Sequence, residues 1–185
     1  ARAPRAPRRA PRRALRAGME QLGSSLDPRS SLPLQLMIWL EDRLTQAVAV
    51  VLLALLVVKP YFFDYPAGAA QFEFMLMLLH PLVQGVRSWL GTAGNKQERT
   101  SCIAWFLWLT VWTALVTGYF WRRQTVGLVI ECGLAAGACG LAALETLQAG
   151  VAALAFCEGP LDVARAGGGF AAAVGAFLYV ALAPG

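Results

Sequence analysis

Long apolar stretches, separated by short polar or turn-forming segments, dominate the chain. They cover residues 44–58, 71–90, 101–121 and 126–156. The last three reach the roughly twenty residues that an α-helix needs to cross about 30 Å of hydrocarbon. Phe62 extends the first stretch, which is shorter. The pattern predicts an all-α, polytopic membrane protein with about four transmembrane helices.

Two weaker segments flank these stretches. Leu32–Leu40 is apolar and precedes three charged residues, so we interpret it as an N-terminal interfacial helix or as an extension of the first span. Residues 168–183 are apolar but short and rich in Ala and Gly, which favours an interfacial or disordered tail over a fifth span. The predicted organisation is a tail over 1–30, a four-helix transmembrane domain over 31–157 and an Ala/Gly-rich tail over 158–185.

The first eighteen residues contain seven arginines, no acidic residue and otherwise only Ala, Pro, Leu and Gly. This composition predicts a basic, disordered segment, because it offers no core and its prolines discourage a helix. A transit-like segment and a stretch foreign to the native protein are the alternatives. The segment lacks the aromatic residues on which nucleic-acid bases stack, so we expect no nucleic-acid partner.

Composition and charge support the membrane interpretation. Hydrophobic residues make up 57% of the chain and charged residues 15%, whereas soluble domains carry about 25% charged residues. With four spans, all basic residues except Lys59, Arg122 and Arg123 fall on the side of the N-terminal segment, the loop after the second span and the C-terminal tail. Basic residues resist translocation, so both termini are predicted to be cytoplasmic.

Two carboxylates lie within the predicted fourth span. Glu131 and Glu145 stand nearly on one helix face, which suits a proton or cation pathway. Hydrogen bonding between helices is the alternative and the one we favour, with Arg87 and Gln84 as available partners.

The other polar residues of the spans have structural interpretations. Glu73 and Lys59 lie near span ends and are expected to reach the lipid headgroups. His80 precedes Pro81, which removes a helix hydrogen bond, and is expected to bond the carbonyl group that is freed. A lone histidine cannot make a metal site, and the sequence contains no phosphate loop or nucleophile elbow. We therefore expect no catalytic residue, metal or cofactor, and a protein that is not an enzyme.

Two pairs of glycines are expected to have structural roles. Gly133 and Gly137 recur at a spacing that permits close approach of a neighbouring helix. After the second span, Gly91 and Gly94 are expected to take positive φ and end the helix at a polar loop over 91–100, and Asn95 to cap a turn or the next segment.

These signatures, taken in order, resemble the four-pass ciliary membrane proteins that include transmembrane proteins 17, 80 and 216. Residues 30–35 (SSLPLQ) look like that family's lead-in to its first span, and Tyr65-Pro66 looks like a pair found after it. Leu144-Glu145, followed eleven residues later by Phe156, resembles the close of the fourth span. The most specific likeness is at 86–95 (VRSWLGTAGN), a segment that contains Arg87, Gly91, Thr92, Gly94 and Asn95.

The resemblance covers about residues 30–156 and departs from the family at Gln84, where a glutamate is usual. It implies a non-enzymatic scaffold at the ciliary transition zone that supports ciliogenesis and the ciliary membrane diffusion barrier. The implied partners are other transition-zone membrane proteins of the tectonic-like complex and the lipid bilayer. Two alternatives are an accessory structural subunit of an organellar membrane complex, suggested by the arginine-rich start, and a small transporter that uses Glu131 and Glu145.

Overall fold

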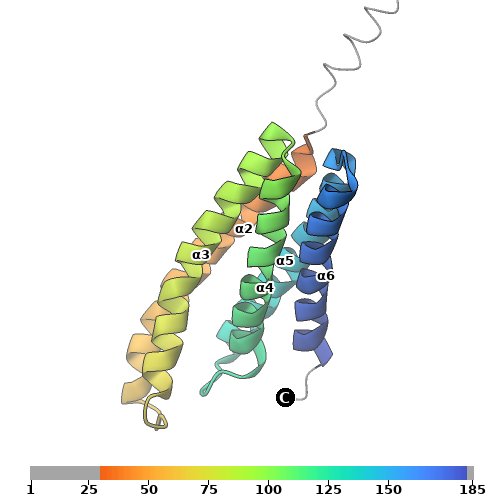
Figure 1. Cartoon of the computed structure of the whole chain (residues 1–185). Helices are drawn as coiled ribbons and strands as arrows, with labels where there is room; N and C mark the ends of the chain where they lie inside the picture. The colour runs from red at the N-terminus through yellow and green to blue at the C-terminus, as the bar shows by residue number, and fades with distance from the viewer. Residues whose placement is uncertain (1–29, 183–185) are drawn as a thin grey trace, which may run out of the picture.

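The computed structural model describes residues 30–182 and consists of five long helices (Figure 1). In chain order they are α2 (Leu32–Val58), α3 (Ala69–Gln97), α4 (Thr100–Arg122), α5 (Val129–Phe156) and α6 (Pro160–Leu182), with a short 3-10 helix, η1 (Lys59–Tyr61), after α2. No strand occurs among the described residues. The predicted all-α fold is confirmed, and the predictions for residues 1–29 fall outside the described part.

The first four helices form an antiparallel bundle, and α6 lies against its outside. Helix α2 packs on α3 and α5, α4 packs on the same two helices, and α6 packs on α4 and α5 (Figure 1). The bundle has two apolar clusters. One, near the N-terminal end of α2, includes Ile38, Phe106 and Phe156. The other, near its C-terminal end, includes Leu52 and Phe120.

Helix α2 is continuous from Leu32 onward, so Leu32–Leu40 extends the first span and is not a separate interfacial helix. Ser31 caps the helix by accepting a hydrogen bond from the backbone N–H of Leu34 (3.3 Å). Neither proline nor glycine occurs between Pro33 and Val58, so nothing in the backbone interrupts the helix.

Helix α3 also continues further than predicted, through Gly91 and Gly94 to Gln97, and the expected loop over 91–100 is wrong. Both glycines have helical conformations and lie where neighbouring helices approach closely. A Cβ added at Gly91 would stand 2.7 Å from the Phe106 ring, and one at Gly94 would stand 2.8 Å from Ile103. These glycines therefore serve close packing, and Glu98 (φ 53°) takes the left-handed position that ends the helix.

The C-terminal segment is a 23-residue helix, α6, so the prediction of a disordered or interfacial tail is wrong. Small residues let it approach α4: Gly118 lies against Val180, and Gly169 lies against the backbone of Ala104. The helices that are long and apolar enough to cross a membrane are Leu32–Tyr61, α4, α5 and α6. The number agrees with the four predicted spans, but α6 replaces the second predicted span.

That second span, α3, has low average hydropathy because it carries several polar residues, and those between Glu73 and Asn95 are buried or half-buried. Its buried face carries Glu73, His80, Gln84, Arg87 and Asn95. Its exposed residues between 72 and 89 are apolar apart from Gly85, and they include Phe72, Met75, Leu82, Val86 and Trp89. A helix that is polar inside and apolar outside suits a hydrocarbon surrounding, so α3 belongs in the membrane beside its neighbours.

The five helices place the two described ends, residues 30 and 182, at opposite ends of the bundle (Figure 1). The prediction that both termini are cytoplasmic assumed four crossings and treated α6 as a tail. The side of the membrane on which each end lies stays a prediction.

The glycines expected to receive a neighbouring helix were also misassigned. Nothing lies within 4 Å of a Cβ placed on Gly133 or Gly137, whereas Gly118 has no room for one. We therefore predict that Gly118→Val forces α4 and α6 apart and lowers stability by about 1–3 kcal/mol, the usual cost of overpacking. Thermal unfolding of the detergent-solubilised protein measures this, with Gly137→Val as the control. Equal midpoints for the two variants would contradict the packing of α6.

Candidate functional site

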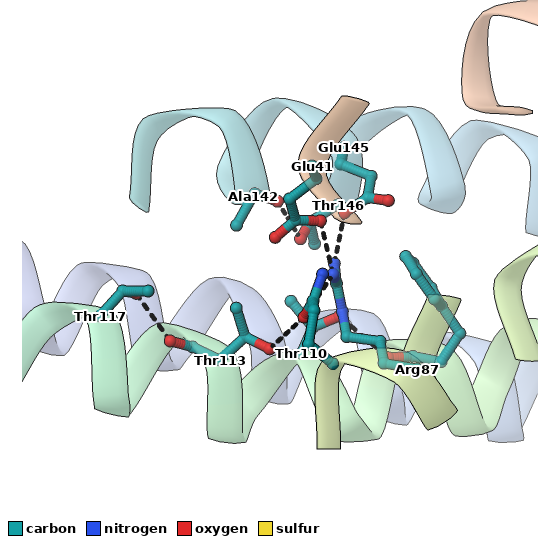
Figure 2. Close-up of polar contacts among 10 residues, drawn as sticks. Glu41, Arg87, Thr110, Thr113, Thr117, Ala142, Glu145 and Thr146 are labelled. Atoms are coloured by element: carbon teal, nitrogen blue, oxygen red, sulfur yellow. Dashed lines mark hydrogen bonds and ion pairs between the residues drawn. The ribbon is translucent and has the colours of Figure 1, made fainter. Parts of the chain in front are cut away.

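The Arg87 side chain lies in the middle of the bundle and joins all four of its helices (Figure 2). It is fully buried. Its Nη1 donates to Glu41 Oε2 of α2 (2.5 Å), and its Nη2 donates to Glu145 Oε2 of α5 (2.5 Å). Its Nε donates to Thr110 Oγ1 of α4 (2.8 Å). The predicted partnership of Arg87 with Glu145 is therefore present.

Further side chains hold the guanidinium in place. Gln84 Oε1 accepts from Arg87 Nη1 (3.3 Å) and from the Thr113 hydroxyl (3.2 Å). The ring of Phe106 stacks on the guanidinium, 4.4 Å from its centre, which adds a cation–π contact. The Thr110 hydroxyl in turn donates a hydrogen bond to the carbonyl of Phe106 (2.9 Å). Gln84 stands where the family that the sequence resembles usually has a glutamate, and its amide oxygen accepts the hydrogen bond from Arg87.

The Arg87 layer lies deep within the bundle. Glu41, Thr110 and Glu145 are each about ten residues from the nearer end of their helix, or about 15 Å at 1.5 Å per residue. That depth is about half the thickness of the hydrocarbon. One guanidinium faces two carboxylates there, and Glu145 Oε1 has no hydrogen-bond partner in the described structure. Removing the arginine would leave buried carboxylates without a counter-charge.

A second ion pair closes the other end of the bundle. Lys59 of η1 is buried, forms an ion pair with Glu131 of α5, and donates to the carbonyl of Val126 (2.5 Å). Glu131 also accepts from the backbone N–H of Leu128 (3.1 Å) and so caps the start of α5. Lys59 was expected at the lipid headgroups, and that prediction is wrong. Glu131 needs a buried counter-charge, and the turn after α2 supplies it.

Glu73 is likewise buried instead of reaching the headgroups. Its carboxylate accepts from the backbone N–H of Thr125 (2.6 Å) and from the hydroxyls of Tyr119 (3.1 Å) and Tyr65 (3.4 Å). Partial burial and the neighbouring Glu73 carboxylate raise the pKa of Tyr65 to about 12, so its phenol remains a hydrogen-bond donor further into the alkaline range than an ordinary tyrosine. Pro66 follows in the turn, and its carbonyl accepts from the N–H of Ala69 (3.1 Å).

At the opposite end, Asn95 ties the start of α2 to the end of α3. Its side chain accepts from the backbone N–H of Ser31 and donates to the carbonyl of Ser31, both at 2.8 Å. Gln35 donates to the Thr92 hydroxyl one turn deeper (3.1 Å). Asn95 was expected to cap a turn or the next segment, but its side chain bonds to Ser31 at the start of α2 instead.

Several predicted site residues are not brought together. Glu131 and Glu145 each have their own cation and do not share one contact. His80 makes no hydrogen bond to the carbonyl expected from the Pro81 break, and its Nδ1 is buried without a partner in the described region. Residues 30–182 contain no cluster of His, Cys, Asp or Glu side chains that could hold a metal ion.

Sequence reasoning missed Glu41 and Lys59, the counter-charges that complete both ion-pair layers. A signal for the site was present in α3. Its buried positions follow a seven-residue repeat, 73, 80, 87 and 94 with 77, 84 and 91, which marks one continuous helix–helix seam. A charged residue on such a seam requires a partner of opposite charge, and Glu41 is one of two acids in the helix that precedes α3.

Comparison with known proteins gave one family. Residues 47–142, about half of the chain, match a family model described as "predicted membrane protein". No solved structure matches the chain.

We predict that Arg87→Gln destabilises the bundle by about 3–5 kcal/mol, because it leaves two buried carboxylates without a counter-charge. The change is measured as loss of thermal stability in detergent. Arg165→Gln, at an exposed position on α6, is the control and should have little effect. If both variants were equally stable, Arg87 would not be the interaction that holds the helices together.

Proposed function

Because this match places the chain in the transmembrane protein 17 family of membrane proteins, to which it belongs, we propose that it is a non-enzymatic membrane scaffold at the ciliary transition zone. In this role its outer faces bind the lipid bilayer and membrane proteins of the tectonic-like complex. It supports ciliogenesis and the diffusion barrier at the cilium base.

The observation that carries the proposal of a scaffold is the use made of the buried charges. Arg87 directs its donors at Glu41, Glu145 and Thr110, one acceptor from each of the other bundle helices. The Lys59–Glu131 pair fixes the opposite end. Charges that are paired with one another inside the bundle make it rigid. A rigid bundle with apolar outer faces is suited to binding other membrane helices.

The ciliary location rests on the family resemblance, and the fold adds one supporting fact. The two segments most similar to the family, 30–35 and 86–95, are far apart in sequence but contact each other. Ser31 pairs with Asn95, and Gln35 pairs with Thr92. The two segments form one contact between α2 and α3, so their residue types have a structural reason to occur together. Two short motifs that matched the family by chance would have no such reason.

The transport alternative is less well supported. A proton or cation pathway needs carboxylates that are free to bind the ion, whereas Glu131 and Glu145 are each in an ion pair. Flux measurements with the protein in liposomes test this directly. Ion flux that Glu145→Gln abolishes would favour transport over the scaffold.

Imaging of the tagged, full-length protein in ciliated cells tests the location. The proposal predicts signal at the cilium base and co-purification with tectonic-like complex proteins. Signal in mitochondria or plastids would contradict it and favour the organellar alternative.

The joint between the two similar segments provides a sharper variant. Asn95→Ala removes two hydrogen bonds, each worth about 1 kcal/mol, and should reduce incorporation into the complex by about half or more. Gln97→Ala, exposed two residues further on, is the matched control and should leave incorporation unchanged. Equal recovery of the two variants would contradict a role of this joint in assembly.

A further inference from the structure

Helix α2 carries a group of polar side chains on its outer surface, Asp42, Arg43 and Gln46, called here the Arg43 patch. Arg43 and Gln46 are exposed, and Asp42 is half-buried. Arg43 Nη1 donates to Gln46 Oε1 (3.2 Å), and Gln46 Nε2 donates to Asp42 Oδ2 (3.0 Å). These bonds stay within one helix, and the exposure of Arg43 and Gln46 leaves the patch open on the outside of the bundle.

The patch lies at the depth of the Arg87 layer. Arg43 follows Glu41 by two residues, about 3 Å along the helix, and Glu41 binds Arg87 in the middle of the bundle. On α2, α3 and α5, the exposed side chains between this depth and the nearer helix ends are apolar apart from Lys96 and Gln97 at the end of α3. They include Leu36, Trp39, Trp89, Val151 and Leu154. The Arg43 patch is therefore surrounded by a surface that suits hydrocarbon.

An arginine facing hydrocarbon is unfavourable unless something brings it acceptors. The Arg43 guanidinium has five N–H donors, of which one hydrogen bond to Gln46 uses a single nitrogen. The Asp42 carboxylate also has room for more than the one donor that it receives from Gln46. Whatever covers the patch must supply an acid and a base at the same depth.

The outer face of α2 has the spacing of a helix–helix seam. Residues 36, 39, 43, 46, 50, 53 and 57 alternate at intervals of three and four, as in a coiled coil. All are exposed except Leu53, which is half-buried. Val50, for example, is 70% exposed. The seam alone would also suit lipid, but a polar residue at its centre would not, and such a residue commonly fixes the register of a paired helix.

We propose that a second copy of this chain covers the Arg43 patch, through parallel pairing of two α2 helices about a two-fold axis along the membrane normal. Such an axis brings residues of equal depth together. Arg43 of each copy then enters a hole bordered by the partner's Asp42 and the partner's Gln46. Each copy gives one acid and one base, so the two patches satisfy each other and the four charges cancel.

Charge reversal distinguishes this pairing from other coverings. Arg43→Asp leaves two acids in the patch and Asp42→Arg leaves two bases, so each variant repels its own copies. A mixture of the two variants, however, presents acids to bases and should associate. Mixing the two variants would not restore association if lipid headgroups or an unrelated protein supplied the hydrogen-bond acceptors of Arg43. The inference is independent of where in the cell the protein resides.

The experiment uses the full chain, labelled with donor or acceptor fluorophores at its C-terminus, in phosphatidylcholine liposomes at increasing dilution. Energy transfer above random proximity measures self-association. We expect association for the wild type, an about tenfold or greater weakening for each reversed variant, corresponding to about 1.4 kcal/mol or more, and recovery when the two variants are mixed. Arg165→Gln, exposed on α6, is the control and should associate like the wild type.

Arg43→Gln keeps the experiment decisive if a reversed variant does not fold, because it removes the charge without adding repulsion and should also weaken association. Circular dichroism in detergent confirms that each variant is folded. A wild type that gives no transfer above random proximity would overturn the proposal. Reversed variants that associate like the wild type, or a mixture that fails to recover, would also overturn it.

Discussion

A charged side chain in hydrocarbon is stable only when counter-charges and hydrogen-bond partners surround it, and Arg87 imposes this condition on the whole bundle. Its partners cannot come from α3 alone. They come from Glu41 on α2, Thr110 on α4 and Glu145 on α5, so the four helices must pack at one register for the arginine to be satisfied. Near the other end of the bundle, the buried Lys59–Glu131 ion pair likewise fixes the turn after α2 against the start of α5.

Close approach of neighbouring helices is the second condition, and it depends on glycines, which have no side chain. Gly91 and Gly94 let α3 contact the helices that also bound the Arg87 layer, and Gly118 lets α6 lie on α4. In hydrocarbon there is no gain from burying apolar surface between helices, so such packing and polar contacts carry the association. The exposed surface is then free to be almost wholly apolar, and the Arg43 patch is an exception that calls for a second molecule.

Much of this arrangement could be predicted from the sequence, because the length of a hydrophobic stretch is a local property. Four of the five helices correspond to predicted spans, and Arg87 was correctly linked to Glu145. The prediction failed at α6, where an apolar but Ala- and Gly-rich stretch was judged too short for a span, although the complete helix is long and apolar enough to be one. The roles of Lys59, Glu73 and Asn95 depend on partners from distant segments. No pattern along the chain shows which helix faces which, so those partners became visible only in the fold.

The position of α3 in the bilayer tests the account most directly, because α3 carries Arg87 inward and apolar residues outward. Spin labels placed singly at Leu78, Leu82 and Val86, with the native cysteines replaced, report collision with oxygen or with a water-soluble nickel chelate in proteoliposomes. The account predicts strong collision with oxygen and little with nickel at all three exposed positions. Strong collision with nickel at these positions would show that α3 lies in water, and would contradict an arginine layer buried within the membrane.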